Sequence, residues 1–204
     1  MIKIKTFKNE ADWLEARRGK ITGTRLGDLV DKKGGGKKIG FYETLAERIA
    51  IPATGENPMD RGKRIEVEAL ERFEKETKKK VNKDLVMWEH EEYPDIAISP
   101  DGFIGKTKIT EACEVKCLNS ARHLEALLTG GIPSEYQYQV LQYFIVNPDL
   151  KKLYFIFYDP RIPNKDMFYH TVNRKDKVSE IEALFEIEKK ALIEFGDIEA
   201  LLVF

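Results

Sequence analysis

The chain has 204 residues, of which 42% are hydrophobic and 10% aromatic, and this composition suits one compact domain over residues 1–204. Its formal net charge of −1 argues against a uniformly basic nucleic-acid binder. Because we find no signal peptide and no apolar run long enough to span a membrane, we expect an intracellular, cytoplasmic protein with no membrane partner.

Basic residues gather near the N-terminal end. Asn9 is suited to cap a helix that continues to Arg18, and Thr22 or Thr24 is suited to cap a short second helix. Residues 31–39, DKKGGGKKI, combine three glycines with four lysines, which predicts a flexible basic loop. The surplus of basic residues near this end and of acidic residues near the other would concentrate positive potential on one surface, although an unevenly charged solvated surface explains the same pattern.

Two helices are predicted next, over residues 41–50 and 60–77. In the second, Glu66 lies near the centre of an apolar stripe with a helical period. A carboxylate in a core-facing stripe is costly to bury unless it is paired or binds a cation. Glu66 is therefore a candidate acid, and a half-exposed, ion-paired glutamate is the alternative.

A predicted three-stranded meander follows, with strands at 84–92, 95–104 and 108–117 and a turn near Gly105. Side chains alternate along a strand, so Glu114 and Lys116 project together. If the last two strands pair as a hairpin, Asp101 lies across the ladder from Glu114. Two carboxylates and an ammonium would then converge.

The rest of the chain completes an α/β (α+β) pattern. We expect a helix near 120–128 and another over 134–146, in which Tyr136 and Gln139 accompany an apolar stripe whose aromatic residues suit a core. Strands at 152–158 and 167–172 and an amphipathic helix from about residue 176 follow. The elements predict a central mixed β-sheet flanked by helices.

The predicted cluster of acids points to a divalent metal. Carboxylates close together need a cation, and oxygen ligands without histidine or thiolate favour Mg²⁺, for which Mn²⁺ can substitute. Lys116 beside the metal would orient or help deprotonate a water, which suits phosphodiester hydrolysis. Cys113 and Cys117 cannot complete a structural zinc site by themselves, and free thiols are the simpler interpretation.

The pattern Pro100-Asp101 … Glu114-Val115-Lys116 resembles the PD-(D/E)xK nuclease superfamily. The surrounding residues resemble one branch of it, the phage lambda exonuclease and the related YqaJ-type viral recombinases. Five blocks carry this resemblance in order: Trp13 … Arg17-x-Gly19-x-Ile21-Thr22, Gly62-Lys63-x-x-Glu66, Ser99-Pro100-Asp101-Gly102, Glu114-x-Lys116-Cys117, and Tyr136-x-x-Gln139-Val140 before Tyr158-Asp159-Pro160-Arg161.

The resemblance implies a restriction-endonuclease-like core and a role for each matched residue. Asp101, Glu114 and the backbone carbonyl of Val115 would hold Mg²⁺, and Glu66 would assist them. Lys116 would act on the attacking water. The residues implied to support this site are Tyr136 and Gln139.

A second group of residues is implied to bind the DNA end. Arg17 matches an arginine that receives the 5′-terminal phosphate, and a guanidinium fork suits a phosphate better than an ammonium does. Thr24 stands where the family can carry a serine, and Ser99 borders the same pocket. Met59 occupies the position of an apolar wedge between the two strands, although an ordinary core methionine fits it nearly as well.

The resemblance also implies an activity. Members of this family form ring-shaped trimers that degrade one strand of duplex DNA from its 5′ end and leave a 3′ overhang for a single-strand annealing protein. We therefore expect a Mg²⁺-dependent 5′-to-3′ double-strand exonuclease that acts in phage-type recombination. The alternatives are a PD-(D/E)xK endonuclease, a catalytically inactive DNA-binding protein of the same fold and, if the matched blocks are coincidental, a small-molecule hydrolase.

Overall fold

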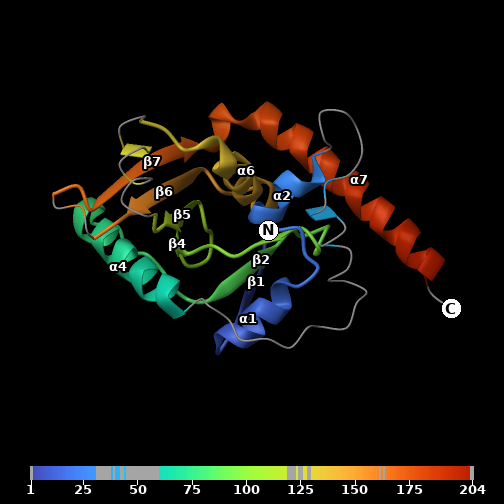
Figure 1. The fold of residues 1–204 in the computed structure, drawn as a ribbon, viewed down its shortest axis with the longest axis horizontal. Helices are drawn as coiled ribbons and strands as arrows, with labels where there is room; N and C mark the ends of the chain where they lie inside the picture. Colours follow the sequence, from blue (N-terminus) through green and yellow to red (C-terminus); the bar gives the residue numbers. More distant parts are fainter. Residues whose placement is uncertain are drawn as a thin grey trace.

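The computed structural model describes residues 2–30, 38, 40, 41, 44, 60–118, 123, 126, 127, 130–160, 162 and 164–202, with the backbone alone at 60–64. Met59 and the predicted loop at 31–39, apart from Lys38, lie outside these residues. So do most of the helices predicted at 41–50 and 120–128. Figure 1 shows helices on both sides of a four-stranded sheet and a second sheet beside it. The predicted α/β class with a central mixed sheet is confirmed.

The four-stranded sheet has the order β4-β5-β6-β7. Its inner strands, β5 (Glu111–Lys116) and β6 (Lys152–Tyr158), run parallel, whereas β4 (Gly102–Ile104) and β7 (Met167–Asn173) pair antiparallel at the two edges. β6 is buried at every position after its first residue. Its aromatic and β-branched side chains therefore place it inside the sheet.

Helices cover both faces of this sheet. α4 (Asp60–Thr77) packs on one face, where Phe73 joins a cluster with Cys113 and Val115. α6 (Gln137–Val146) follows the 3₁₀ turn η1 (Ser134–Tyr136) and packs on the other face, with α7 (Val178–Leu202) against it. Because side chains alternate along β5, Glu114 points away from the α4 side and toward α6.

The second sheet corrects the predicted meander. β1 (Lys3–Thr6), β2 (Val86–Glu89) and β3 (Ala97–Ile98) form an antiparallel sheet of their own. The strand predicted at 95–104 is thus two strands, because Pro100 has no N–H to donate and interrupts the ladder between β3 and β4. Gly102, the first residue of β4, packs closely against Val81, because a Cβ at this position would lie 2.5 Å from Val81 Cγ1. The break places Asp101 where the chain passes from one sheet to the other.

The N-terminal helices lie against these strands. α1 (Glu10–Arg17) begins at Asn9, whose Oδ1 accepts a 2.9 Å hydrogen bond from the Asp12 N–H, as predicted. Ile21 then forms a parallel bridge with Ile96, and α2 (Gly23–Leu29) begins after Thr22 and packs on α6. None of the described helices is both long and apolar enough to cross a membrane.

Candidate active site

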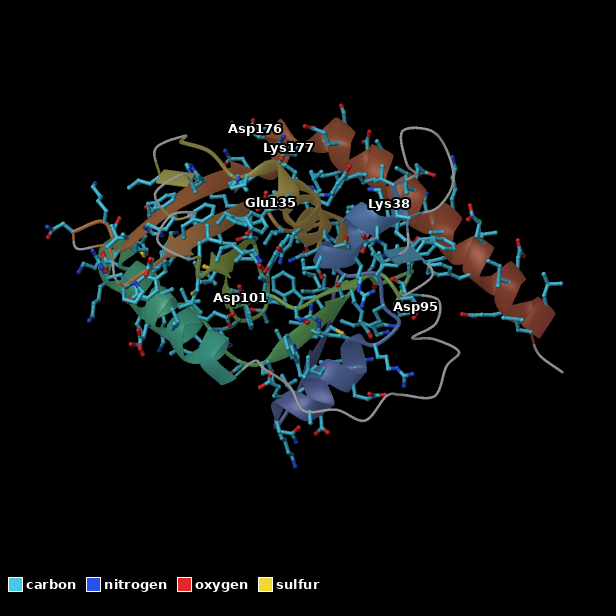
Figure 2. The ribbon with its side chains drawn as sticks, viewed as in Figure 1. Lys38, Asp95, Asp101, Glu135, Asp176 and Lys177 are labelled. Atoms are coloured by element: carbon cyan, nitrogen blue, oxygen red, sulfur yellow. The ribbon has the colours of Figure 1, made fainter. Side chains whose placement is uncertain are left out.

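The hairpin register brings the two predicted acids together. β4 pairs with β5 so that Gly102 lies opposite Cys113, and Asp101 Oδ2 accepts a 2.7 Å hydrogen bond from the Val115 N–H. Asp101 therefore lies beside Glu114 and Val115, as the sequence predicted. Figure 2 shows Asp101 near the middle of the molecule, at the start of β4.

Three side chains converge on the Glu114 carboxylate, which is only 3% exposed. Oε1 accepts hydrogen bonds from Lys116 Nζ at 2.7 Å and from Gln139 Nε2 at 2.5 Å. Oε2 accepts a 2.6 Å bond from the Tyr143 hydroxyl. The predicted grouping of Glu114, Lys116 and Gln139 is thus observed.

Tyr143 is a site residue that sequence reasoning missed. The sequence analysis assigned the aromatic residues of this helix to the core, and the Tyr143 ring is indeed buried. Its hydroxyl, however, donates a hydrogen bond to Glu114. The available signal was its spacing: residues four apart lie on the same face of a helix, so Tyr143 shares the face of Gln139. Burial and the Glu114 carboxylate raise the pKa of Tyr143 well above its usual value, so the hydroxyl keeps its proton.

The carboxylates repel one another. Burial, the Glu114 charge and the Glu66 charge raise the pKa of Asp101 well above its usual value, against the opposing effects of the Val115 N–H and Lys116. Burial lowers the pKa of Lys116, but Glu114 and Asp101 raise it by more, so the net shift is upward. An excess of buried negative charge is the electrostatic condition that a divalent cation relieves.

The donor set fits magnesium better than zinc. Among the residues that the structure describes, no group of three His, Cys, Asp or Glu side chains has metal-binding geometry. The predicted oxygen donors are Asp101, Glu114 and the Val115 carbonyl, and Mg²⁺ typically takes one or two carboxylates and keeps several waters. Burial raises the pKa of Cys117 to about 12, so its thiol stays protonated and is a poor ligand.

Glu66 approaches from the opposite side of the sheet. It is half-buried on α4, and its charge raises the pKa of both Asp101 and Cys117. The structure thus brings Glu66 within electrostatic range of Asp101. Its place among the metal ligands stays a prediction.

Tyr136 also contacts Lys116, whose ammonium is hydrogen-bonded to Glu114. The Lys116 ammonium stands 5.1 Å from the centroid of the Tyr136 ring, a cation–π contact. The same ring packs against Phe155 of β6, with centroids 5.5 Å apart. Tyr136 therefore fixes the lysine rather than the carboxylates.

Arg17 reaches the same site from the end of α1. Its guanidinium carbon lies 4.5 Å from the centroid of the Trp13 ring, and Trp13 Nε1 donates a 3.3 Å hydrogen bond to the Val86 carbonyl. Burial lowers the pKa of Arg17, although the Glu114 and Asp101 charges act in the opposite direction. Arg17 is thus held close to the carboxylate cluster by packing on a tryptophan.

The other predicted end-binding residues have different surroundings. Ser99 is 8% exposed, and its hydroxyl makes no hydrogen bond to the described part of the protein. Thr24 is exposed, with its hydroxyl 3.2 Å from that of Thr22. Gly23 brings α2 next to the site, because a Cβ there would lie 2.8 Å from Gln139 Cγ. Met59 is outside the described residues.

One family model matches most of the chain. Residues 12–147 match the YqaJ-like viral recombinase domain. A comparison with curated protein sequences finds no significant match.

Solved structures of exonucleases share the fold of this chain. An alkaline exonuclease from Laribacter hongkongensis, LHK-Exo, has a TM-score of 0.77 and 25% identity, over 94% of this chain and 97% of that one. LHK-Exo in complex with dAMP has a TM-score of 0.76 and 26% identity over the same shares. A phage-related exonuclease from Haemophilus somnus 129PT shares the fold at 12% identity, with a TM-score of 0.59 over 90% of this chain and 96% of that one.

Proposed function

The chain belongs to the YqaJ-like viral recombinase family and is a nuclease of the lambda exonuclease type; from this premise we propose that it is a Mg²⁺-dependent 5′-to-3′ exonuclease acting on duplex DNA. One observation carries the proposal. The acid pair with its lysine and the Trp13-packed Arg17 meet at a single site. Hydrolytic groups and a phosphate-binding group are therefore within reach of one terminal nucleotide.

Asp101, Glu114 and the Val115 carbonyl would hold Mg²⁺, with Glu66 assisting. A bound Mg²⁺ supplies charge stabilisation for the phosphodiester and activation of a water. Gln139 and Tyr143 hold the Glu114 carboxylate in one orientation through both of its oxygens. A carboxylate held in this way keeps its geometry before substrate arrives, which lowers the cost of reorganisation.

Lys116 acts on the attacking water. Its ammonium is anchored between Glu114 Oε1 and the Tyr136 ring, which limits where its remaining N–H groups point. A positioned ammonium orients the water and stabilises negative charge as the phosphate is attacked.

Arg17 confers the preference for a DNA end. A guanidinium binds a terminal phosphate, which carries more negative charge than an internal one, through charge-assisted hydrogen bonds. The buried Ser99 hydroxyl would donate to the same phosphate, and Thr24 would contact it from the solvent side. LHK-Exo was crystallised with dAMP, which supports a 5′-mononucleotide as the product here.

Strand polarity, the annealing role and assembly belong to the same proposal. Degradation from the 5′ end leaves a 3′ overhang, the substrate of a single-strand annealing protein. A ring-shaped trimer around the duplex would retain DNA electrostatically despite a net charge of −1, because only the channel lining has to be basic.

A digestion assay tests the function directly. Linear duplexes with a 5′ phosphate or a 5′ hydroxyl and a closed circular duplex are incubated with the protein and Mg²⁺. We expect mononucleotide release from linear DNA, faster with the 5′ phosphate, and none from the circle. Equal cutting of circular DNA would favour the endonuclease, and absence of Mg²⁺-dependent cleavage would favour an inactive DNA-binding protein.

A further inference from the structure

A buried amide joins three segments of the site. Gln142 of α6 is fully buried, and its Nε2 donates hydrogen bonds to the carbonyls of Ile21, at 3.1 Å, and Ala97, at 3.5 Å. Ile21 lies in the connection between α1 and α2, and Ala97 lies in β3. The side chain therefore ties together segments that flank the proposed phosphate-binding and metal-binding residues.

Each of these three segments leads to the candidate active site. The connection at Ile21 follows Arg17 and continues into Gly23, which packs against Gln139. β3 continues through Ser99 to Asp101. α6 itself carries Gln139 and Tyr143, the two side chains that hold Glu114. A shift of the amide would therefore move Arg17 relative to the acids.

Glu188 of α7 is a buried carboxyl that the proposed mechanism does not use. It is 0% exposed, and among the described residues no hydrogen bond of normal geometry reaches either of its oxygens or Gln142 Oε1. Three acceptors without donors are costly in a protein interior. A proton on Glu188 removes this conflict, because the resulting O–H donates to Gln142 Oε1.

The surroundings of Glu188 agree with a neutral carboxyl. Burial raises the pKa of Glu188 to about 8, and a hydrogen-bonding interaction with the Gln142 side chain lowers it, which places the amide beside the carboxyl. α6 and α2 pack against α7, which also contacts Phe41 through Phe195 and His90 through Phe185. No charged group of either helix alters its pKa.

We propose that protonated Glu188 hydrogen-bonds Gln142 Oε1 and so makes Gln142 a positioning residue, which holds the Arg17 segment in register with the Asp101 and Glu114 carboxylates. The bond fixes the orientation of the amide, with Nε2 toward the two carbonyls and Oε1 toward Glu188. The consequence for DNA ends rests on the proposed exonuclease function. The existence of the Glu188–Gln142 pair does not depend on that function.

The pair is tested by the pH dependence of stability. Urea-unfolding midpoints are measured at pH 6 and pH 9 for the wild type, Glu188→Gln and Glu182→Gln. Glutamine keeps a donor toward Gln142 but cannot ionise, and Glu182 is an exposed glutamate on the same helix. We expect the urea concentration at the unfolding midpoint to be lower at pH 9 than at pH 6 for the wild type and for Glu182→Gln. For Glu188→Gln this decrease should be smaller. An equal loss in all three proteins would overturn the proposal.

The positioning role is tested by the preference for phosphorylated ends. The ratio of kcat/KM between 5′-phosphate and 5′-hydroxyl duplexes is measured for the wild type, Gln142→Leu and Glu188→Gln. We expect the ratio to fall about tenfold in Gln142→Leu, because displacement of a binding group costs this much or more, and to persist in Glu188→Gln. A folded Gln142→Leu protein with the wild-type ratio would refute the positioning role.

The two arms separate failure of the pair from failure of the function. If Gln142→Leu does not fold, Glu188→Ala, which leaves Oε1 without a donor, replaces it in the ratio measurement with the same expectation. If the wild type itself shows no preference for a 5′ phosphate, the end-binding part of the proposed function is wrong. The unfolding arm then still decides whether the Glu188–Gln142 pair exists.

Discussion

The Tyr143 hydroxyl donates a 2.6 Å hydrogen bond to Glu114 Oε2, while Gln139, one helical turn earlier, donates to Oε1. A single helix thus holds both oxygens of one carboxylate. Hydrogen bonds to charged groups in a buried setting contribute about 1.5–3 kcal/mol each.

Tyr143→Phe removes this hydrogen bond while keeping the ring. Since about 2 kcal/mol of interaction with Glu114 is lost, we expect kcat/KM for duplex digestion to fall on the order of tenfold or more. Tyr138→Phe on the same helix, whose ring packs over Gly27, is the matched control. A Tyr143→Phe enzyme as active as the control would remove the hydroxyl from the site.

Lys116→Met separates chemistry from binding. The ammonium is replaced by an apolar side chain of similar length, so we expect hydrolysis to fall by about 10² to 10³. Affinity for duplex DNA, measured by fluorescence anisotropy without Mg²⁺, should change little. Lys106→Met in the exposed turn is the control. Turnover within tenfold of the wild type would exclude Lys116 from the mechanism.

Arg17→Gln should reduce the preference for a 5′ phosphate. Loss of a charge-assisted contact of about 1.5–3 kcal/mol predicts a fall of at least tenfold in the ratio of rates on 5′-phosphate and 5′-hydroxyl ends. Arg17→Lys keeps the charge without the planar fork and should be intermediate. Arg18→Gln, beside Glu15 at 3.8 Å, is the control. An unchanged ratio in Arg17→Gln argues for a different phosphate site.

Asp101→Asn tests the metal and the repulsion together. The amide oxygen can still accept from the Val115 N–H, but the charge that burial, Glu114 and Glu66 disfavour is gone. Without metal we therefore expect the variant to be more stable than the wild type by about 1 kcal/mol or more. Mg²⁺ should raise the Tm of the wild type and leave that of Asp101→Asn nearly unchanged. Equal Mg²⁺ shifts in calorimetry would place the metal elsewhere.

Gly23→Ala should destabilise the protein and displace Gln139. Its Cβ would stand 2.8 Å from Gln139 Cγ, 3.0 Å from Gln139 Cα and 3.1 Å from Ile98 Cδ1, and such overpacking costs about 1–3 kcal/mol. Gly196→Ala on α7 is the matched control, because nothing lies within 4 Å of its Cβ. Alanine there should stabilise the helix by about 0.5–1 kcal/mol. Urea unfolding distinguishes the two signs.

The pH dependence of stability follows from Glu188. Burial raises its pKa from the ordinary glutamate value of 4.5 to about 8. The contribution of Glu188 to the free energy of unfolding is therefore most favourable below pH 4.5. It declines as pH rises toward 8, because the unfolded chain loses this proton at a lower pH than the folded protein does. Above pH 8 the contribution of Glu188 should no longer change. Urea midpoints between pH 5 and 9 measure this decline, and a rise over that range would contradict it.

Local patterns predicted much of the fold. The helix at residues 60–77 coincides with α4, and the strand at 152–158 coincides with β6, because long periodic or apolar runs favour one secondary structure strongly. β1 was not predicted, since all four of its residues are exposed and leave no pattern of burial. The single strand predicted at 95–104 was wrong, because the effect of Pro100 on strand pairing depends on which neighbours the chain meets.

The sequence by itself determined the chemistry of the site: alternation along one strand placed Glu114 and Lys116 on one face, and the hairpin placed Asp101 opposite them. Only the tertiary structure decided what surrounds these groups. Tyr143, Gln142 and Glu188 resemble core positions in a sequence, because a helical period shows which residues are buried but not which polar atoms they meet. The partners of Tyr143 and Gln142 lie in β5, in β3 and in the connection between α1 and α2. These segments are far apart in the chain, and only packing brings them together.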